Sequence, residues 1–327
     1  MRVPRVRLPE DPRARHARLR DYFCDRDAEA VPDGDGWLLN LYWPDDRDRH
    51  VDPSLADHLA SWGCGLGGMV HAVRRHGRVT TALYDTWTLV SWSRWAAASG
   101  IDSAAPLTIL HVDDHRDLMS PRLFLHDGAW LDPIRGAPVR VEDPASVQDA
   151  LESGAIGMGS FLTPFLHAFP RAEVRHLCQP PKAHGTRDFR IELGIKADDL
   201  LDPEMMRPSV NLLPAEGSGP SHYRLTTSHH AWLDDIGSGP VLLHIDMDYF
   251  NNRFDGDGDW SDHAERLDPD PDEVTAEIRR MADALRAGEL LPRIADAVVA
   301  YSPGFFPSEL WDEAERTLRD SLGELYA

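Results

Sequence analysis

Three short apolar runs in the sequence end in aspartates. They are RVTTALYD (residues 78–85), LTILHVD (107–113) and VLLHIDMD (241–248). Such runs are typical of strands that are buried on both faces of a parallel sheet. Ionisable side chains at the ends of buried strands are costly to remove from water unless another charge compensates them. We therefore expect a parallel sheet whose strand ends share a charged site.

Helical patterns alternate with these runs, and a fourth apolar run, ADAVVAY (295–301), follows later in the chain. The expected helices have apolar stripes or terminal signals. They cover residues 88–99, 144–154, 271–288 and 311–325. Strands that alternate with helices predict a three-layer α/β/α fold with a mainly parallel sheet. Ligands of such folds bind outside the carboxyl ends of the strands, which is where the aspartates lie.

The first 35 residues differ from the rest of the chain. They are rich in Arg, Pro and Asp, and a strand-like pattern, WLLNLYW, begins only at about Gly36. We expect an irregular, Arg-rich arm over residues 1–35 and a single α/β catalytic domain over residues 36–327. With seven Arg among its first twenty residues, the arm is either a disordered tail or a docking segment for an acidic partner.

The composition argues against several classes of protein. A formal net charge of −21 disfavours nucleic acid as the main partner and suits either cationic substrates or simple solubility. No stretch approaches the ~18 apolar residues of a membrane helix, and the N-terminus lacks the apolar region of a secretory signal. Three scattered cysteines without a CxxC pair predict a cytoplasmic protein without a disulfide framework. The oligomeric state stays open, and a homo-oligomer is one possibility.

The aspartate clusters have the spacing of a metal site. In LHVDDHRDL, the alternate residues Asp113, His115 and Asp117 can converge on one side of the chain. Asp246 and Asp248 repeat this arrangement after the later strand. Four carboxylates and one imidazole form an oxygen-rich set that suits Mn²⁺ better than zinc. One tetrahedral ion would not use five ligands, so we expect two ions; a solvated acidic turn is the alternative for either motif alone.

The motifs LTILHVDDHRDL and LLHIDMDYF resemble those of the arginase/agmatinase (ureohydrolase) superfamily, which shares its fold with histone-deacetylase-like enzymes. The chain is most similar to an arginase-like family that includes the peptide arginases of ribosomal-peptide gene clusters. IGMGSFLTP (156–164) and AYSPGFFP (300–307) extend the resemblance, which covers roughly residues 75–327. It implies an enzyme that converts arginine in a precursor peptide, or a small guanidine compound, with release of urea. It also implies the metal ligands Asp113, His115, Asp117, Asp246 and Asp248. Deacetylase-like members instead use one zinc and lack two of these carboxylates.

The chain departs from this family at one metal ligand. Arginases have a further His on the strand that precedes the DxHxD motif, and here that strand ends ALYDTWT. Asp85 is the expected replacement, because manganese accepts a carboxylate. Thr86 is the other alignment, and His71 lies 42 residues before Asp113, too far for the usual connection.

Catalytic and substrate-binding positions depart as well. The loop GSFLTPFLH best matches the one that carries the acid/base His in arginases, so Ser160 is expected to bind substrate. His167 and His126 are the candidate proton shuttles, although an ordinary structural His is an alternative for each. The guanidinium-binding Glu is absent from its usual place, and Glu309 is the nearest substitute.

An acidic stretch, NNRFDGDGDW, follows the second metal motif. Its Asp255, Asp257 and Asp259 have the spacing of a calcium loop, but Trp260 and Arg266 stand where such a loop has Gly and Glu. We expect a solvated acidic loop that attracts an arginine-bearing peptide by charge.

Three functions follow from these observations. The first is a manganese hydrolase of guanidinium groups, most plausibly those of peptidyl arginine. The second is a single-metal amidohydrolase or deacylase, suggested by the absent His. The third is a non-catalytic homologue that binds a peptide or a partner protein.

Overall fold

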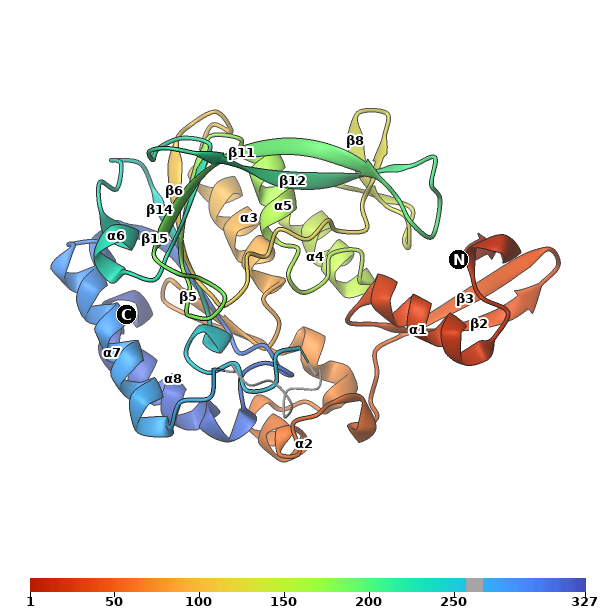
Figure 1. Cartoon of the computed structure of the whole chain (residues 1–327), viewed down its shortest axis with the longest axis horizontal. Helices are drawn as coiled ribbons and strands as arrows, with labels where there is room; N and C mark the ends of the chain where they lie inside the picture. Colours follow the sequence, from red (N-terminus) through yellow and green to blue (C-terminus); the bar gives the residue numbers. More distant parts are fainter. Residues whose placement is uncertain (257–266) are drawn as a thin grey trace.

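A large sheet runs through the computed structural model, which describes residues 1–256 and 267–327 (Figure 1). The sheet is nine-stranded, in the order β12-β11-β13-β10-β6-β14-β15-β5-β4. The strands from β13 to β5 in this order are parallel, and antiparallel strands flank them on both edges. The strands are β4 (Val73–His76), β5 (Val79–Ala82), β6 (Leu107–Val112), β10 (Ala172–Leu177), β11 (Thr186–Ala197), β12 (Met206–Ala215), β13 (His222–Thr226), β14 (Val241–Asp246) and β15 (Ile294–Ala300).

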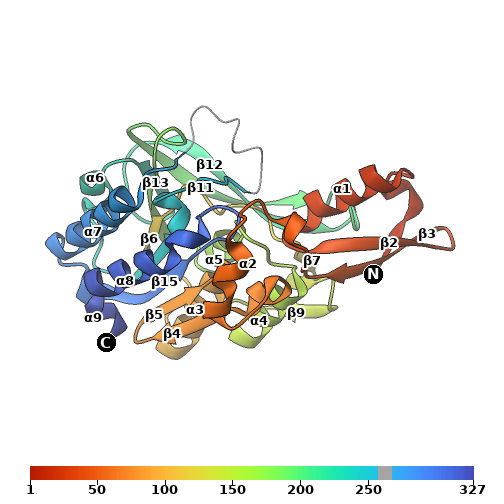
Figure 2. The ribbon, with the colours of Figure 1, turned by 90° about the horizontal axis from the view of Figure 1, so that it is seen from below.

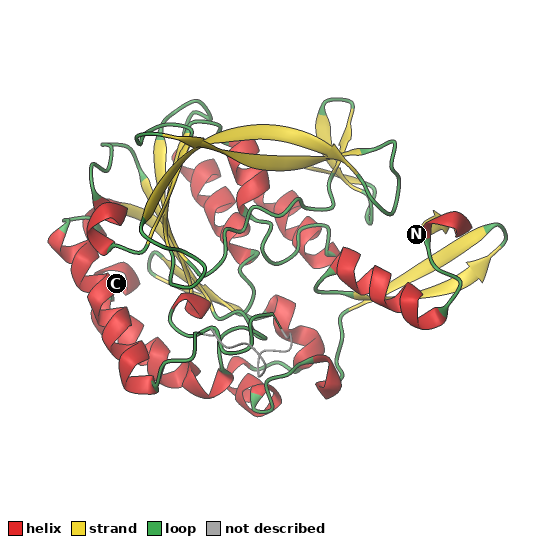
Figure 3. Cartoon of the chain, viewed as in Figure 1, coloured by secondary structure: helices red, strands yellow, loops and turns green. Residues whose placement is uncertain are grey.

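Helices cover both faces of this sheet (Figures 1 and 3). One face carries α3 (Trp87–Ser99), α4 (Pro144–Ser153) and α5 (Leu162–Ala168). The other carries α6 (His229–Leu233), α7 (Pro271–Ala287), α8 (Trp311–Ser321) and the short α9 (Gly323–Tyr326). The start of α7 shows why these segments are helical: Asp270 and Glu273 form a reciprocal capping box. The predicted three-layer α/β/α fold with a mainly parallel sheet is confirmed.

The parallel strands reverse their order between β6 and β14. From β6 the chain proceeds outward through β10 to β13, and it then returns to place β14 on the other side of β6. Such a reversal opens a crevice outside the carboxyl ends of the two central strands. The register pairs His244 of β14 with His111 of β6. Asp246 and Asp113, two residues further along each strand, therefore come to neighbouring strand ends.

The first 42 residues form a folded unit, here called the N-terminal unit, that projects from the main body (Figure 2). It contains β1 (Arg2–Pro4), α1 (Pro12–Phe23), β2 (Asp27–Asp33) and β3 (Gly36–Tyr42). The prediction of an irregular arm over residues 1–35 is therefore wrong, and its boundary falls inside the β2–β3 hairpin.

Sparse apolar residues explain this error. Only Leu19, Tyr22 and Phe23 of α1 are buried, so the helix has no long apolar stripe in the sequence. Their core also takes in side chains from elsewhere in the chain, including Phe124 and Leu200. The N-terminal unit is thus stabilised by packing against the main body.

One further α-helix and three further strands are short and lie at the periphery. They are α2 (Leu55–His58) and a three-stranded sheet of β7 (Phe124–His126), β8 (Ala129–Asp132) and β9 (Ala137–Val139). Within the described ranges, no helix combines the length and the apolar character that are needed to cross a membrane.

Candidate metal centre

A cavity of about 800 Å³ lies at the carboxyl ends of the parallel strands. Most of the predicted metal ligands line it: Asp85, His115, Asp117, Asp246 and Asp248. Asp113 follows β6 directly and is buried against this set, since its Oδ1 accepts a hydrogen bond from the His115 amide. The structure therefore brings all the predicted ligands together. At the position of the family's missing His, it is Asp85, not Thr86 or His71, that lines the cavity.

Four of these carboxylates lack a Lys or Arg partner in the described chain, and we call Asp85, Asp113, Asp117 and Asp246 the uncompensated group; Asp113 Oδ1 also lies 3.7 Å from His115 Nδ1. None of them forms an ion pair with any Lys or Arg of residues 1–256 and 267–327. One oxygen each of Asp85, Asp113 and Asp117 is buried without a hydrogen-bond partner among the described residues. Burial, reinforced by neighbouring negative charge, raises the pKa of Asp85, Asp113 and Asp246 well above the ordinary value. Burial raises the pKa of Asp117 to about 6. Unpaired buried carboxylate oxygens are costly, and a divalent cation is the partner that this donor set fits.

A row of buried imidazoles lies beside the uncompensated group. His176, His111 and His244 are register partners on the neighbouring strands β10, β6 and β14. His111 Nδ1 lies 3.0 Å from His244 Nδ1, and His111 Nε2 lies 3.1 Å from the His115 carbonyl oxygen. Burial lowers the pKa of all three, to about 3 for His176 and His244, so the imidazoles are neutral at physiological pH.

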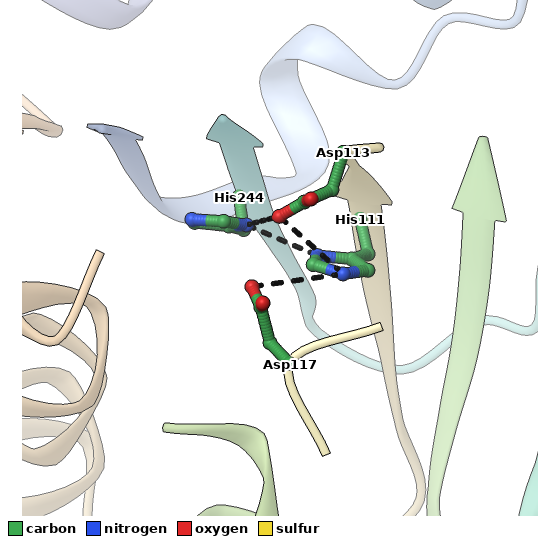
Figure 4. A group of neighbouring side chains, drawn as sticks. All are labelled: His111, Asp113, Asp117 and His244. Carbon is green, nitrogen blue, oxygen red and sulfur yellow. Dashed lines mark hydrogen bonds and ion pairs between the residues drawn. The ribbon is translucent and has the colours of Figure 1, made fainter. Parts of the chain in front are cut away.

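Two of these histidines join two aspartates in a cluster that could bind a metal ion (Figure 4). Ligand atoms of His111, Asp113, Asp117 and His244 all lie within 4.8 Å of one another. Sequence analysis missed both histidines because they stand inside apolar runs. The signal was present, however: both strands end in His-x-Asp, and alternate residues of a strand point to the same face.

Another set of carboxylates has cationic partners, and we call Asp114, Asp248 and Asp255 the compensated group; Asp114 and Asp248 line the cavity, and Asp255 shares Lys182 with Asp114. Lys182 Nζ lies 3.1 Å from Asp114 and 2.6 Å from Asp255, and His115 Nδ1 lies 2.7 Å from Asp248 Oδ2. Burial alone would raise the pKa of Asp248, but His115 lowers it below the ordinary value. His115 and Lys182 likewise lower the pKa of Asp255. The chain itself therefore supplies each of these carboxylates with a positive partner, although burial and the charge of Asp248 still raise the pKa of Asp114.

Backbone conformations at the cavity are strained in several places. Asp117, Ser302 and Cys24 line the cavity with φ values of 52°, 41° and 57°, which non-glycine residues rarely adopt. Such strain persists only where the surroundings impose it and is concentrated at functional sites. In its strained conformation Ser302 orients a candidate metal ligand, because its hydroxyl donates a 2.5 Å hydrogen bond to Asp246 Oδ2.

The predicted proton shuttles are not brought to the cavity. His167 lies on α5, where its Nε2 is 3.1 Å from the Ser209 carbonyl oxygen and its ring packs against Trp130. His126 lies on β7 and is exposed. Both histidines were selected from their position in the sequence after the DxHxD motif. Position in the sequence does not determine whether a loop brings a side chain to the cavity.

The predicted substrate-binding residues are not cavity residues either. Ser160 is buried, and its hydroxyl donates to the Gly157 carbonyl oxygen, whereas the preceding Gly159 lines the cavity and donates its N–H to Asp85. Glu309 pairs with Arg253. Of the expected acidic loop, Asp257, Asp259 and Trp260 lie outside the described residues, while Asp255 belongs to the compensated group.

The sequence matches no protein-family model and no curated protein. Membership of the arginase-like family therefore remains a prediction that rests on the motifs and on the arrangement of the metal centre.

Proposed function

We propose that this protein is a hydrolase that uses two Mn²⁺ ions to convert the arginine side chain of a peptide to ornithine, with release of urea. The uncompensated group is the observation that carries the proposal. In the described part of the chain, these four buried carboxylates have no Lys or Arg partner, and three of them keep an oxygen without a hydrogen-bond partner. An oxygen-rich donor set of this kind suits manganese. The motif resemblance supplies the reaction.

Two overlapping sets of residues would hold the ions. Asp85, Asp113, Asp117 and Asp246 form the first set, in which burial and mutual repulsion favour a bound cation. Asp113, His115 and Asp248 form the second, with ligand atoms within 4.8 Å of one another. Asp113 belongs to both and is the residue that would link the two ions. Ions bound in this way supply a hydrolytic nucleophile at neutral pH by lowering the pKa of water.

The chain's own residues orient the ligands and attract the substrate. Ser302 holds Asp246, and the Gly159 amide holds Asp85 at 2.8 Å. Outer contacts of this kind fix the direction of a metal ligand. The acidic wall favours a cationic side chain in the cavity. Water then adds to the guanidinium carbon, the bond from that carbon to the side-chain nitrogen breaks, and the products are urea and the ornithine amine.

Mass spectrometry of peptides provides the direct test. The purified protein, loaded with Mn²⁺, is incubated with arginine-containing peptides, and the expected result is loss of CN₂H₂ from the peptide together with one urea for each modified residue. A chelator should abolish both products. If the metal-loaded protein leaves every arginine peptide and free guanidine compound unchanged, the proposal is wrong.

A single-metal amidohydrolase or deacylase is the second candidate, and the cluster in Figure 4 favours it. Two imidazoles and two carboxylates are a donor set that zinc also accepts. Metal counting separates the candidates: the first requires two ions per chain with manganese effective, the second one ion with zinc effective. His244→Asn should abolish binding of that single ion, whereas the two-ion centre should retain both ions in this variant.

A further inference from the structure

The cavity has a wall that the metal centre does not use. Arg20, Asp21, Cys24 and Asp25 line it, and all of them belong to the N-terminal unit. The unit therefore packs against the main body and also contributes residues to the same space as the candidate metal ligands. Residues of its α1–β2 turn stand where they can contact a bound substrate.

Asp25 is held close to the metal centre by one short loop. The N–H of Met158 donates to Asp25 Oδ2 at 2.8 Å, and the N–H of the next residue, Gly159, donates to Asp85 Oδ2 at 2.8 Å. Adjacent residues are ~3.8 Å apart along the chain, so the two carboxylates are held near each other. The charge of Asp25 is one of the influences that raise the pKa of Asp85.

In the same loop, the absence of a side chain at Gly157 leaves room for the Asp25 carboxylate. A Cβ atom at Gly157 would lie 2.9 Å from Asp25 Oδ2 and 2.7 Å from a guanidinium nitrogen of Arg122. A side chain at residue 157 would therefore displace Asp25 or Arg122. The turn itself is strained, because Cys24, which precedes Asp25, has a φ of 57°.

Asp25 keeps one oxygen for a ligand. Its Oδ1 accepts no hydrogen bond from residues 1–256 or 267–327, and the residue is only partly buried where it lines the cavity. Burial raises the pKa of Asp25, and the positive charges of Arg122 and Arg49 oppose this rise, although neither arginine forms an ion pair with Asp25 in the described chain. Within the described chain, Asp25 also belongs to none of the side-chain groups that could hold a metal. It is thus a carboxylate beside the metal centre with an oxygen open to the cavity.

We propose that Asp25, supplied by the N-terminal unit, binds the cationic side chain of the substrate and positions it against the metal centre. This inference rests on the proposed function, since a guanidinium is the cation to be recognised. A guanidinium forms short, charge-assisted hydrogen bonds to a carboxylate. Recognition by Asp25 makes residues 1–42 part of the active site.

The test compares Asp25→Asn with the wild-type protein, both loaded with Mn²⁺. The amide oxygen of Asn can still accept from Met158, so the loop contact is retained while the charge is removed. We expect KM for an arginine-containing peptide to rise about 10- to 100-fold, because the variant loses a charge-assisted hydrogen bond to the substrate. We expect kcat and the number of bound manganese ions to change little. Asp33→Asn is the matched control, because Asp33 lies in the same unit but is exposed and pairs with Arg2. An unchanged KM in Asp25→Asn would overturn the inference.

Two further measurements keep this test decisive. If Asp25→Asn does not fold, Gly157→Ala crowds both Asp25 and Arg122, disturbs the position of the Asp25 carboxylate by another route and should raise KM as well. If the wild-type protein hydrolyses no peptide, calorimetric titration of the Mn²⁺-loaded protein with an arginine peptide replaces kinetics. Binding that requires Asp25 would then uphold the inference while the proposed reaction fails, and absence of binding would overturn both.

Discussion

The uncompensated and compensated groups lie at the same cavity and balance negative charge in different ways. Asp114 and Asp255 are paired with Lys182, and Asp248 is paired with His115. Asp85 and its three neighbours have no Lys or Arg partner among the described residues. The comparison teaches where a foreign cation is needed: a carboxylate beside a lysine already has a positive partner, whereas the buried carboxylates of the uncompensated group have no Lys or Arg partner in the described chain.

Asp113→Asn should produce the largest effect. It removes the carboxylate shared by both proposed ion sets, so manganese affinity should fall by more than about 100-fold, more than the loss of an outer contact costs. Without metal the variant should be more stable than wild type by on the order of 1 kcal/mol, because one repelling charge is gone. Urea unfolding with and without Mn²⁺ measures both effects.

Asp296→Asn is the control for this comparison. Asp296 is equally buried but accepts a hydrogen bond from Ser91 and pairs with Arg75. Its replacement should destabilise the protein by about 1–3 kcal/mol whether or not metal is present. Equal behaviour of Asp113→Asn and Asp296→Asn would contradict the distinction between the two kinds of carboxylate.

The next effect is a dependence of metal-free stability on pH. The folded-state pKa of Asp117 is about 6, above the ~3.9 of an unfolded Asp. The folded state therefore holds a proton that the unfolded state releases between these values. This contribution to stability is fully present below pH ~4 and is lost as the pH rises through about 6, a change on the order of 3 kcal/mol.

Manganese should reverse this trend, because ligands must lose their protons to bind a metal. Urea midpoints measured from pH 4.5 to pH 7 (roughly the window set by the two pKa values) with EDTA or with Mn²⁺ give the comparison. Metal-free stability that rises across this window would show that Asp117 is compensated after all.

Ser302→Ala should have a smaller effect on metal binding. The variant removes the hydrogen bond that orients Asp246, and such outer contacts are worth about tenfold in affinity at the low end of their range. Ser308→Ala is the matched control, since the Ser308 hydroxyl is buried without a hydrogen-bond partner in the described chain. Manganese titration by calorimetry distinguishes the two variants. Equal affinities would mean that the strained Ser302 does not serve the metal centre.

Lys182→Met should have the smallest effect, on the compensated group and on His115, whose Nε2 lies 2.7 Å from Lys182 Nζ. It removes the cation between Asp114 and Asp255, and because Lys182 is 32 % exposed the expected loss of unfolding free energy is only about 1 kcal/mol. Added Mn²⁺ should recover part of this loss, since the site would then lack its own cation. Lys196→Met, at an exposed position on β11, should change neither stability nor metal response.

The parts of the fold and site that could be predicted are those that depend on short, continuous stretches of sequence. β6 and β14 are short apolar runs with aspartates at their ends, and parallel strands bring such ends to one edge of a sheet. For that reason Asp113, His115 and Asp246 could be assigned to one place without a structure. The amphipathic α7, with its capping box, could be placed equally well.

The remainder depends on contacts between distant segments. Lys182 follows β10, and the sequence around it gives no sign that it pairs with Asp114. Asp25 stands in a unit whose helix buries few side chains, and its link to the metal centre passes through the amide of Met158. Partners of this kind are set by the three-dimensional path of the chain, so local pattern cannot reveal them.

The pairing of β6 with β14 also determines when the metal centre can form. Its two halves are contributed by residues 133 positions apart, as in the contact between His115 and Asp248. A shift of this pairing by one residue would turn His244 to the opposite face of the sheet. A metal ion held by this centre would therefore bind only chains in which this distant pairing is already correct. By binding the native pairing alone, it would shift the equilibrium from misaligned chains toward the native fold.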